Sequence, residues 1–229
     1  MILYDLMKNY ALHAGLPPAV ETLHPELGQS LALFHSCLIE AGMDHQERED
    51  DSHRLTASPL DILPNHLSRF VVGFLPFNSV ATKEETNAVL FDVYSFLRWL
   101  EKRDISHGLE NMDYQTMVRE LTQAQERCLQ LSHFLDEETL RILDDPPAIV
   151  NTINEIFKVA RIEGNYINLE SEFHSDPIRI HLPDEIINLV RLNDYLDLVL
   201  GDTSEKWVIL EAGQVFPEGD TNPRPSTRN

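Results

Sequence analysis

The amino-acid sequence predicts an α+β protein in which an irregular helical bundle precedes a small β-barrel-like module and a disordered C-terminal tail. Apolar residues recur at helical spacing through most of the first 155 residues. From residue 156 onward they fall in short runs separated by turn residues, which is typical of strands. Residues 218–229 have nothing to bury. We therefore expect a helical domain over 1–155, a β module over 156–217 and a disordered tail over 218–229.

The helix expected over about 82–102 has the best-formed apolar face in the chain. That face consists of Val89, Leu90, Val93, Phe96, Leu97 and Leu100. The preceding Thr82 and Glu85 form a capping box, in which each side chain accepts a hydrogen bond from the backbone N–H of the other. The other helices are expected over 2–14, 25–41, 60–76, 113–134, 137–143 and 147–155. Residues 44–58 are acidic and predict a solvated loop.

The helix expected over 113–134 carries an apolar seam at alternating spacings of four and three residues. The seam consists of Met117, Leu121, Ala124, Cys128, Leu131 and Leu135. Such a seam packs against a neighbouring helix, which we take to belong to the same chain. An exposed seam that pairs two copies of the chain is the alternative, so a homo-oligomer stays open.

Two hairpins are expected in the β module. The first turns at 163–165 and the second at 201–202, each between short apolar runs. Residues 178–182 alternate like a strand, 184–190 form a helical turn, and 215–216 add a last short strand. About five short strands within some 60 residues predict a small barrel or a curled sheet.

The charge balance is strongly acidic. The chain has 18 Lys and Arg against 38 Asp and Glu, a formal net charge of −20, and a pI near 4.7. Duplex DNA and anionic lipid surfaces attract basic proteins, so this charge disfavours direct nucleic-acid binding and membrane binding. Two interpretations remain: the acidity keeps the protein soluble, or it attracts a partner protein with a basic surface.

Cysteine content and hydropathy predict a reduced, cytoplasmic protein. Cys37 and Cys128 lie far apart, each within an apolar helical pattern, so we expect two buried free thiols. The N-terminus lacks the pattern of a secretory signal, and no window approaches roughly 18 consecutive apolar residues. We therefore expect no membrane span.

Metal-binding and phosphate-binding motifs are absent from the sequence. Among the ten histidines, only His45 and His53 lie near several acids, namely Asp44, Glu49 and Asp50. Their spacing matches no rigid metal site, which favours a solvated loop. The nine glycines form neither of the common phosphate-binding loops. We expect no metal ligand, no cofactor and no catalytic residue. This expectation favours a protein that is not an enzyme.

Two further patterns have plain structural explanations. The acidic pairs Asp144–Asp145 and Glu84–Glu85 are interpreted as acids at helix N-termini, where the helix dipole stabilises them. Arg98–Trp99 with Lys102–Arg103 comes nearest to the basic and aromatic pattern that binds single-stranded nucleic acid. We interpret its cations as the polar face of a helix and Trp99 as a residue at the core edge.

Two short stretches resemble known families. The sequence from Tyr94 to Ile105 is similar to a helix end in the core-binding domain of tyrosine recombinases, although no recombinase catalytic domain follows. Residues 180–190, 193–201 and 207–210 resemble the AbrB-like swapped-hairpin pattern, with Asn193 in place of the usual glycine and without the basic residues that contact DNA. This second resemblance implies a β module with a tendency to dimerise.

These observations predict an acidic interaction or adaptor protein that is not an enzyme and works through contacts with another protein. Two alternatives remain. One is a regulator associated with nucleic acid, acting through a basic partner or an AbrB-like β module. The other is an enzyme whose site the sequence does not reveal.

Overall fold

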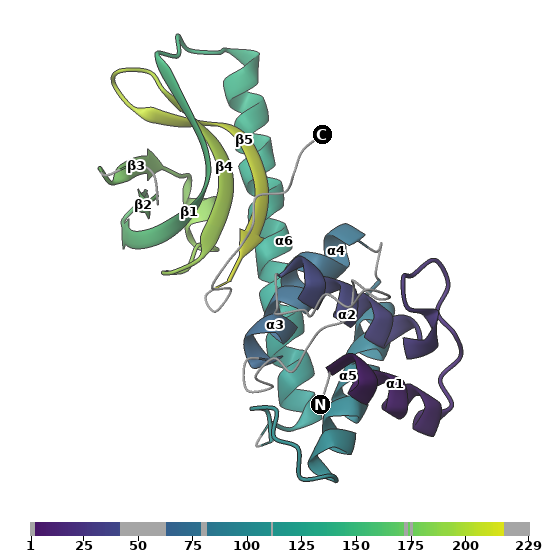
Figure 1. The fold of residues 1–229 in the computed structure, drawn as a ribbon. Coiled ribbons are helices and arrows are strands. Elements are labelled where there is room, and N and C mark those ends of the chain that lie inside the picture. Colours follow the sequence, from purple (N-terminus) through teal and green to yellow (C-terminus); the bar gives the residue numbers. More distant parts are fainter. Residues whose placement is uncertain are drawn as a thin grey trace. The chain divides into compact units, whose positions relative to one another are not determined.

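The computed structural model describes residues 3–41, 63–78, 82–110, 112–171, 174 and 176–217, and it confirms the α+β class (Figure 1). The chain divides into two compact units, Met1–Thr122 and Gln123–Asn229. The acidic loop expected over 44–58 and the tail expected over 218–229 lie outside the described residues.

The first unit is helical. Its elements are α1 (Leu3–Ala14), η1 (Pro25–Leu27), α2 (Gln29–Glu40), α3 (Leu63–Arg69), η3 (Phe70–Phe74), α4 (Leu75–Asn78), α5 (Lys83–Glu101) and the beginning of α6 (Tyr114–Asp144). Of these, η3 is a π-helical turn that joins α3 to α4. The core is rich in aromatic side chains, and Phe34 of α2 lies 5.0 Å from Phe70 between ring centroids.

The start of α5 confirms the predicted capping box. The backbone N–H of Thr82 donates to Glu85 Oε2 at 2.7 Å, and the backbone N–H of Glu85 donates to Thr82 Oγ1 at 3.2 Å. The predicted apolar face of this helix is buried at Leu90, Val93, Phe96, Leu97 and Leu100. Two backbone donors at the helix start are thereby satisfied.

Helix α6 differs from the prediction of two helices over 113–134 and 137–143. It runs without a break from Tyr114 to Asp144. Residues 134–137 contain neither Gly nor Pro, and the buried positions Leu131, Leu135 and Thr139 continue the helical spacing. The helix contributes its beginning to the first unit and its residues from Gln123 onward to the second.

The helix expected over 147–155 is wrong, because strand β1 (Asn151–Glu163) occupies most of that segment. Residues 151–158 pair with residues 202–195 of strand β4 (Tyr195–Asp202) in one antiparallel ladder. The segment is rich in Ile, Val and Thr, whose branched side chains fit a sheet better than a helix. Cross-strand pairing therefore prevails over the weak helical spacing in this segment.

The second unit contains a curled antiparallel sheet that forms half a barrel (Figure 1). The remaining strands are β2 (Tyr166–Glu170), β3 (Ile178–His181) and β5 (Trp207–Phe216), with the short helix α7 (Asp184–Ile187) before β4. The strand order is β3-β2-β1-β4-β5. The curl brings Cα atoms of β3 and β5 within 8 Å of each other. The predicted hairpin β1–β2 is confirmed. Strands β4 and β5 also form a hairpin, but it turns at 203–206 instead of 201–202, because Gly201 and Asp202 still pair with Val208 and Trp207.

A β-bulge in β1 changes which side chains point outward. Val159 pairs with the buried Leu169, but the next pair is Arg161 with Asn168, so Ala160 is an extra residue. Ile162 then pairs with the buried Ile167. Inward positions of β1 are therefore three residues apart across the bulge instead of two, and Arg161 points to the outward face.

Helix α6 also packs on the sheet within the second unit. Cys128, Leu131 and Leu135 are buried, and Ser132 Oγ donates to the backbone carbonyl of Gly213 in β5 at 2.6 Å. Among the described residues, no helix combines the length and the hydrophobicity that a membrane crossing requires.

Candidate binding surfaces

The two thiols are buried, as the sequence predicts. Neither Cys37 nor Cys128 is part of a disulfide, and both thiols have almost no exposed surface. Burial raises the pKa of Cys128 to about 12, although the neighbouring Arg127 guanidinium opposes this shift. A nucleophilic cysteine requires the opposite environment, an exposed and electropositive one that favours thiolate. Cys128 is therefore a core residue.

The described part of the chain contains no candidate metal site built from His, Cys, Asp or Glu. No group of three or more His, Cys, Asp or Glu there is placed to hold a metal ion. His45 and His53 with Asp44, Glu49 and Asp50 lie outside the described residues.

The two acidic pairs have different outcomes. Glu84 and Glu85 lie in the first turn of α5, as expected. Asp144 is the last residue of α6 and Asp145 follows it, because a strand rather than a helix comes after this pair. The helix dipole does not stabilise acids at that end, so the interpretation of this pair was wrong.

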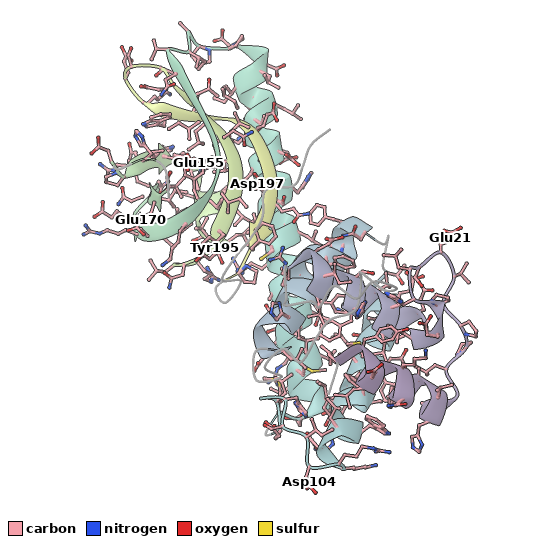
Figure 2. The ribbon with its side chains drawn as sticks, viewed as in Figure 1. Glu21, Asp104, Glu155, Glu170, Tyr195 and Asp197 are labelled. Atoms are coloured by element: carbon pink, nitrogen blue, oxygen red, sulfur yellow. The ribbon has the colours of Figure 1, made fainter. Side chains whose placement is uncertain are left out.

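Two carboxylates that lie close together in the sheet also fail to form an acid pair. Figure 2 labels Glu155 in β1 and Asp197 in β4. Glu155 pairs with Leu198, and Asp197 pairs with Ile156. Side chains alternate between the two faces of a strand, so these carboxylates point to opposite faces of the sheet. They cannot act together on one substrate atom.

A cluster of rings lies between α1 and α2. Tyr4 contacts His24 and His35 at centroid distances of 4.9 and 5.7 Å, and its hydroxyl donates to Glu26. Burial would raise the pKa of Glu26, but the Tyr4 hydrogen bond and nearby positive groups outweigh burial and lower it. The residues of this cluster line neither of the two cavities described below. We interpret the cluster as packing of polar rings.

The residues Arg98, Trp99, Lys102 and Arg103 lie at the end of α5 and in the turn after it. Arg98 forms an ion pair with Glu101 on the same helix. Trp99 is buried with 8% of its surface exposed, at the core edge where we expected it. Arg103 stacks on the Trp99 ring with its Cζ 3.7 Å from the ring centroid. Trp99 and Arg103 are therefore in direct contact.

Trp99 and Arg103 line a cavity of about 490 Å³ in the first unit. Its lining residues are Leu6, Asn9, His13, Trp99, Arg103 and Ile105. We call this space the Trp99 cavity. A second cavity, of about 300 Å³, is lined by Gly108, Leu109, Met112, Asp113, Thr116 and Glu120.

The strongest candidate binding surface lies on the outward face of β1, β2 and β3. Five residues define it, and we call it the cationic strand face. They are Arg161, Tyr166, Asn168, Arg179 and His181. The strand register places Arg161, Asn168 and Arg179 side by side in one row across the three strands. Tyr166 and His181 are neighbours in the next row.

Contacts within the cationic strand face hold its side chains in place. The guanidinium of Arg179 lies over the Tyr166 ring, 4.1 Å from its centroid, in a cation–π contact. The Tyr166 and His181 rings meet edge to face at 5.1 Å. Glu163 lies between the two arginines, 2.8 Å from Arg161 Nη2 and 3.9 Å from Arg179 Nη2.

The cationic strand face is open to solvent. The side chains of Arg161 and Arg179 are 71% and 56% exposed, and Tyr166 is 39% exposed. One carboxylate compensates one of the two guanidinium charges, so the face stays positive in a chain whose net charge is −20. Arginine forks bind carboxylates in bidentate fashion, and exposed aromatic rings add contact area.

Sequence reasoning missed this face because the residues come from three strands and depend on the bulge. Simple alternation places Val159 and Arg161 on the same side of β1, whereas the bulge separates them. The signal that could have revealed the face is the hairpin turn itself. Counting outward from Gly164–Asn165 places Arg161 opposite Asn168.

The two family resemblances map onto the structure in part. The sequence from Tyr94 to Ile105 forms the end of α5 and the turn after it. The AbrB-like order of strand, Leu-Pro, short helix and two strands is present as β3, α7, β4 and β5. Asn193 adopts φ 66°, the left-handed conformation that glycine takes readily and Asn tolerates.

Comparisons with protein-family models, with curated proteins and with solved structures found no match for this chain.

Proposed function

We propose that this chain is an interaction protein, not an enzyme, and that it binds another protein through the cationic strand face. The observation that carries this proposal is the row of Arg161, Asn168 and Arg179 beside Tyr166 on one exposed surface. Arginine and tyrosine are enriched in protein interfaces and among the residues that contribute most to binding.

The stacked geometry supports binding at this face. Arg179 and Tyr166 already hold each other, so less side-chain freedom is lost when a partner binds. The guanidinium edges of Arg161 and Arg179 are exposed. Their N–H groups can donate hydrogen bonds to a second carboxylate beside that of Glu163. The partner would therefore place an acidic segment on this face.

The net charge of the chain refines the partner chemistry. A charge of −20 attracts a partner whose wider surface is basic, whereas the cationic strand face recognises carboxylates. The partner we propose has both features: an acidic segment that contacts Arg161 and Arg179, and a basic surface around it. A partner surface that is uniformly acidic would be repelled by the chain as a whole, and one that is uniformly basic would be repelled by the cationic strand face.

Single-stranded nucleic acid is the second candidate ligand for the same face. The strand order, with a helix between β3 and β4 and β3 close to β5, matches the five-stranded OB type of barrel. In that fold the face of strands 2 and 3 binds oligonucleotides. Tyr166 and His181 could stack on bases. The net charge of −20 opposes this candidate, and fold likeness alone does not establish function.

Photo-crosslinking distinguishes the two candidates. A photoreactive amino acid replaces Asn168 in the full chain, expressed in its native host, and a second version carries it at the exposed Glu205 as a control. We expect an adduct from position 168 that resists nuclease, is degraded by protease, and is absent from position 205. A nuclease-sensitive adduct would support the nucleic-acid candidate instead.

A charge reversal tests the role of the arginines in the same experiment. The double variant Arg161→Glu and Arg179→Glu should abolish the adduct, because both side chains would then repel an acidic segment. Arg141→Glu is the matched control, since Arg141 is 64% exposed and lies on α6 away from this face. An adduct that survives the double variant, or no adduct at all, would refute the proposal.

A further inference from the structure

We propose that the Trp99 cavity binds a small organic acid, meaning a molecule with an apolar body and a carboxylate. This site is separate from the cationic strand face and does not depend on the function proposed above. The cavity volume of about 490 Å³ suits a small molecule, since ligand pockets usually measure about 300–1,000 Å³.

Two helices and one turn build the cavity. Leu6, Asn9 and His13 lie on one side of α1, at spacings of three and four residues. Trp99 lies in the last turn of α5, and Arg103 lies two residues after the end of that helix. Helical geometry therefore fixes the positions of Leu6, Asn9, His13 and Trp99, and the turn after α5 places Arg103.

The turn after α5 brings the sixth residue, Ile105, to the cavity. Asp104 adopts φ 56°, and the N–H of Ile105 donates to the carbonyl of Leu100 at 3.2 Å. The N–H of Asp104 donates to the carbonyl of Glu101 at 2.9 Å. These two bonds form a Schellman motif, which folds the chain back over the last helical turn.

Arg103 is held in position but retains free hydrogen-bond donors. Its guanidinium stacks on Trp99, and Nη1 donates to the Trp99 carbonyl at 3.3 Å. In the part of the chain that the structure describes, no carboxylate pairs with Arg103. A guanidinium has five N–H donors, so most of the fork stays available for an anion.

The polar lining of the cavity selects an anion. Its polar side chains are the Arg103 guanidinium, the Asn9 amide and the His13 imidazole, each of which can donate a hydrogen bond. Among the residues that the structure describes, no Asp or Glu lines it, although the chain has 38 acids and 18 Lys and Arg. The 300 Å³ cavity of the same unit, in contrast, is lined by Asp113 and Glu120.

The other residues that line the cavity would contact the apolar body of the ligand. Leu6, Trp99 and Ile105 present hydrocarbon or aromatic surface. The Trp99 indole N–H is buried and has no hydrogen-bond partner among the described residues. A cavity that combines apolar walls with a few donors is the usual form of a small-molecule site.

NMR titration of the full chain tests this proposal, because the protein contains two tryptophans and hence two indole N–H signals. The probes are benzoate, which has a ring and a carboxylate, benzyl alcohol, which has the ring alone, and acetate, which has the carboxylate alone. We expect benzoate, at up to about 10 mM, to shift the Trp99 indole and Asn9 amide signals but not the Trp207 indole signal. Benzyl alcohol and acetate should bind at least about ten-fold more weakly.

Two variants make the test specific. Arg103→Gln should weaken benzoate binding by about ten-fold or more, while Lys102→Gln, a neighbouring exposed cation that does not line the cavity, should leave it unchanged. An unchanged Trp207 signal and melting temperature would show that both variants fold. Equal binding of benzyl alcohol, no shift of the Trp99 signal, or no effect of Arg103→Gln would overturn the proposal.

Discussion

Arg127 of α6 and Asp194, just before β4, form a bidentate ion pair inside the second unit. Arg127 Nη1 and Nη2 lie 2.6 and 2.8 Å from the two carboxylate oxygens. Asp194 is fully buried, and its carboxylate also accepts the backbone N–H of Arg191 at 2.8 Å. Arg127 donates a further bond to the carbonyl of Leu189 at 2.9 Å. This network ties the long helix to the segment that leads into the sheet.

Breaking this ion pair should destabilise the protein strongly. Arg127→Leu leaves the Asp194 carboxylate buried without its counter-charge, and we expect a loss of about 3–5 kcal/mol in the free energy of unfolding by urea denaturation. Arg141→Leu, which removes an exposed arginine paired with Glu138, should cost less than about 1 kcal/mol. Similar losses in the two variants would contradict the burial-based explanation.

The Cys128 thiol should be inert in the folded protein. Burial raises its pKa to about 12, so roughly one molecule in ten thousand carries the thiolate at pH 8. In a Cys37→Ser background, which leaves Cys128 as the single thiol, we expect no iodoacetamide labelling at pH 8 within the time that labels the urea-unfolded chain fully. Mass spectrometry measures the labelled fraction, and comparable labelling of the folded chain would disprove the assignment.

Glu110 should contribute stability that depends on pH. A hydrogen bond from Ser106 Oγ, then bonds from backbone N–H groups, lower the pKa of Glu110 from 4.5 to about 2. A carboxylate whose pKa is lower in the folded state stabilises it fully above the unfolded pKa, and this contribution disappears as the pH falls toward the folded pKa.

The melting temperatures of the wild type and of Glu110→Gln should therefore differ most above pH 4.5. The difference should shrink as the pH falls from 4.5 toward 2. Glu120→Gln, which removes an exposed carboxylate on α6, serves as the control and should show a smaller difference at neutral pH. A Glu110→Gln effect that is constant between pH 7 and pH 2 would show that the charge of this residue is not responsible.

Asp104→Gly should stabilise the first unit. Helix α1 ends with Gly15 at φ 65° and with a bond from Leu16 N–H to the Ala11 carbonyl, the same type of ending that α5 makes with Asp104. A side chain is unfavourable in that conformation, so we expect a gain of about 0.5–1 kcal/mol in thermal or urea unfolding. Asp104→Ala retains the Cβ and should give no such gain. Asp104 is exposed at the edge of the first unit, so replacing its side chain by glycine removes no buried contact (Figure 2).

Local signals in the sequence predicted the elements whose cause is local. The Thr82–Glu85 capping box and the turn at Gly164–Asn165 each depend on a few neighbouring residues. The error over 147–155 occurred where distant pairing decides. Residues 147–155 have a weak helical pattern of their own, and only the eight pairs with β4 make residues 151–158 a strand.

The candidate surfaces were harder to predict for the same reason. Arg161 and Arg179 are 18 residues apart in the chain, and the β2–β3 register with the Ala160 bulge brings them into one row. Two lining residues of the Trp99 cavity, Trp99 and Arg103, stand close together in the sequence, at the end of a helix and in the turn after it. The lining residues from α1 lie nearly ninety residues earlier, and no periodicity within one helix can indicate that contact.

The continuity of α6 has a practical consequence for dissecting this protein. A cut between Thr122 and Gln123 would sever about four backbone hydrogen bonds that span it and leave both fragments with an uncapped helical end. A fragment that begins at residue 156 would lose Arg127 and the first five residues of β1, so Asp194 would have no counter-charge. Fragments of the sheet should therefore begin no later than residue 123, and each needs a new N-cap residue at its first helical turn.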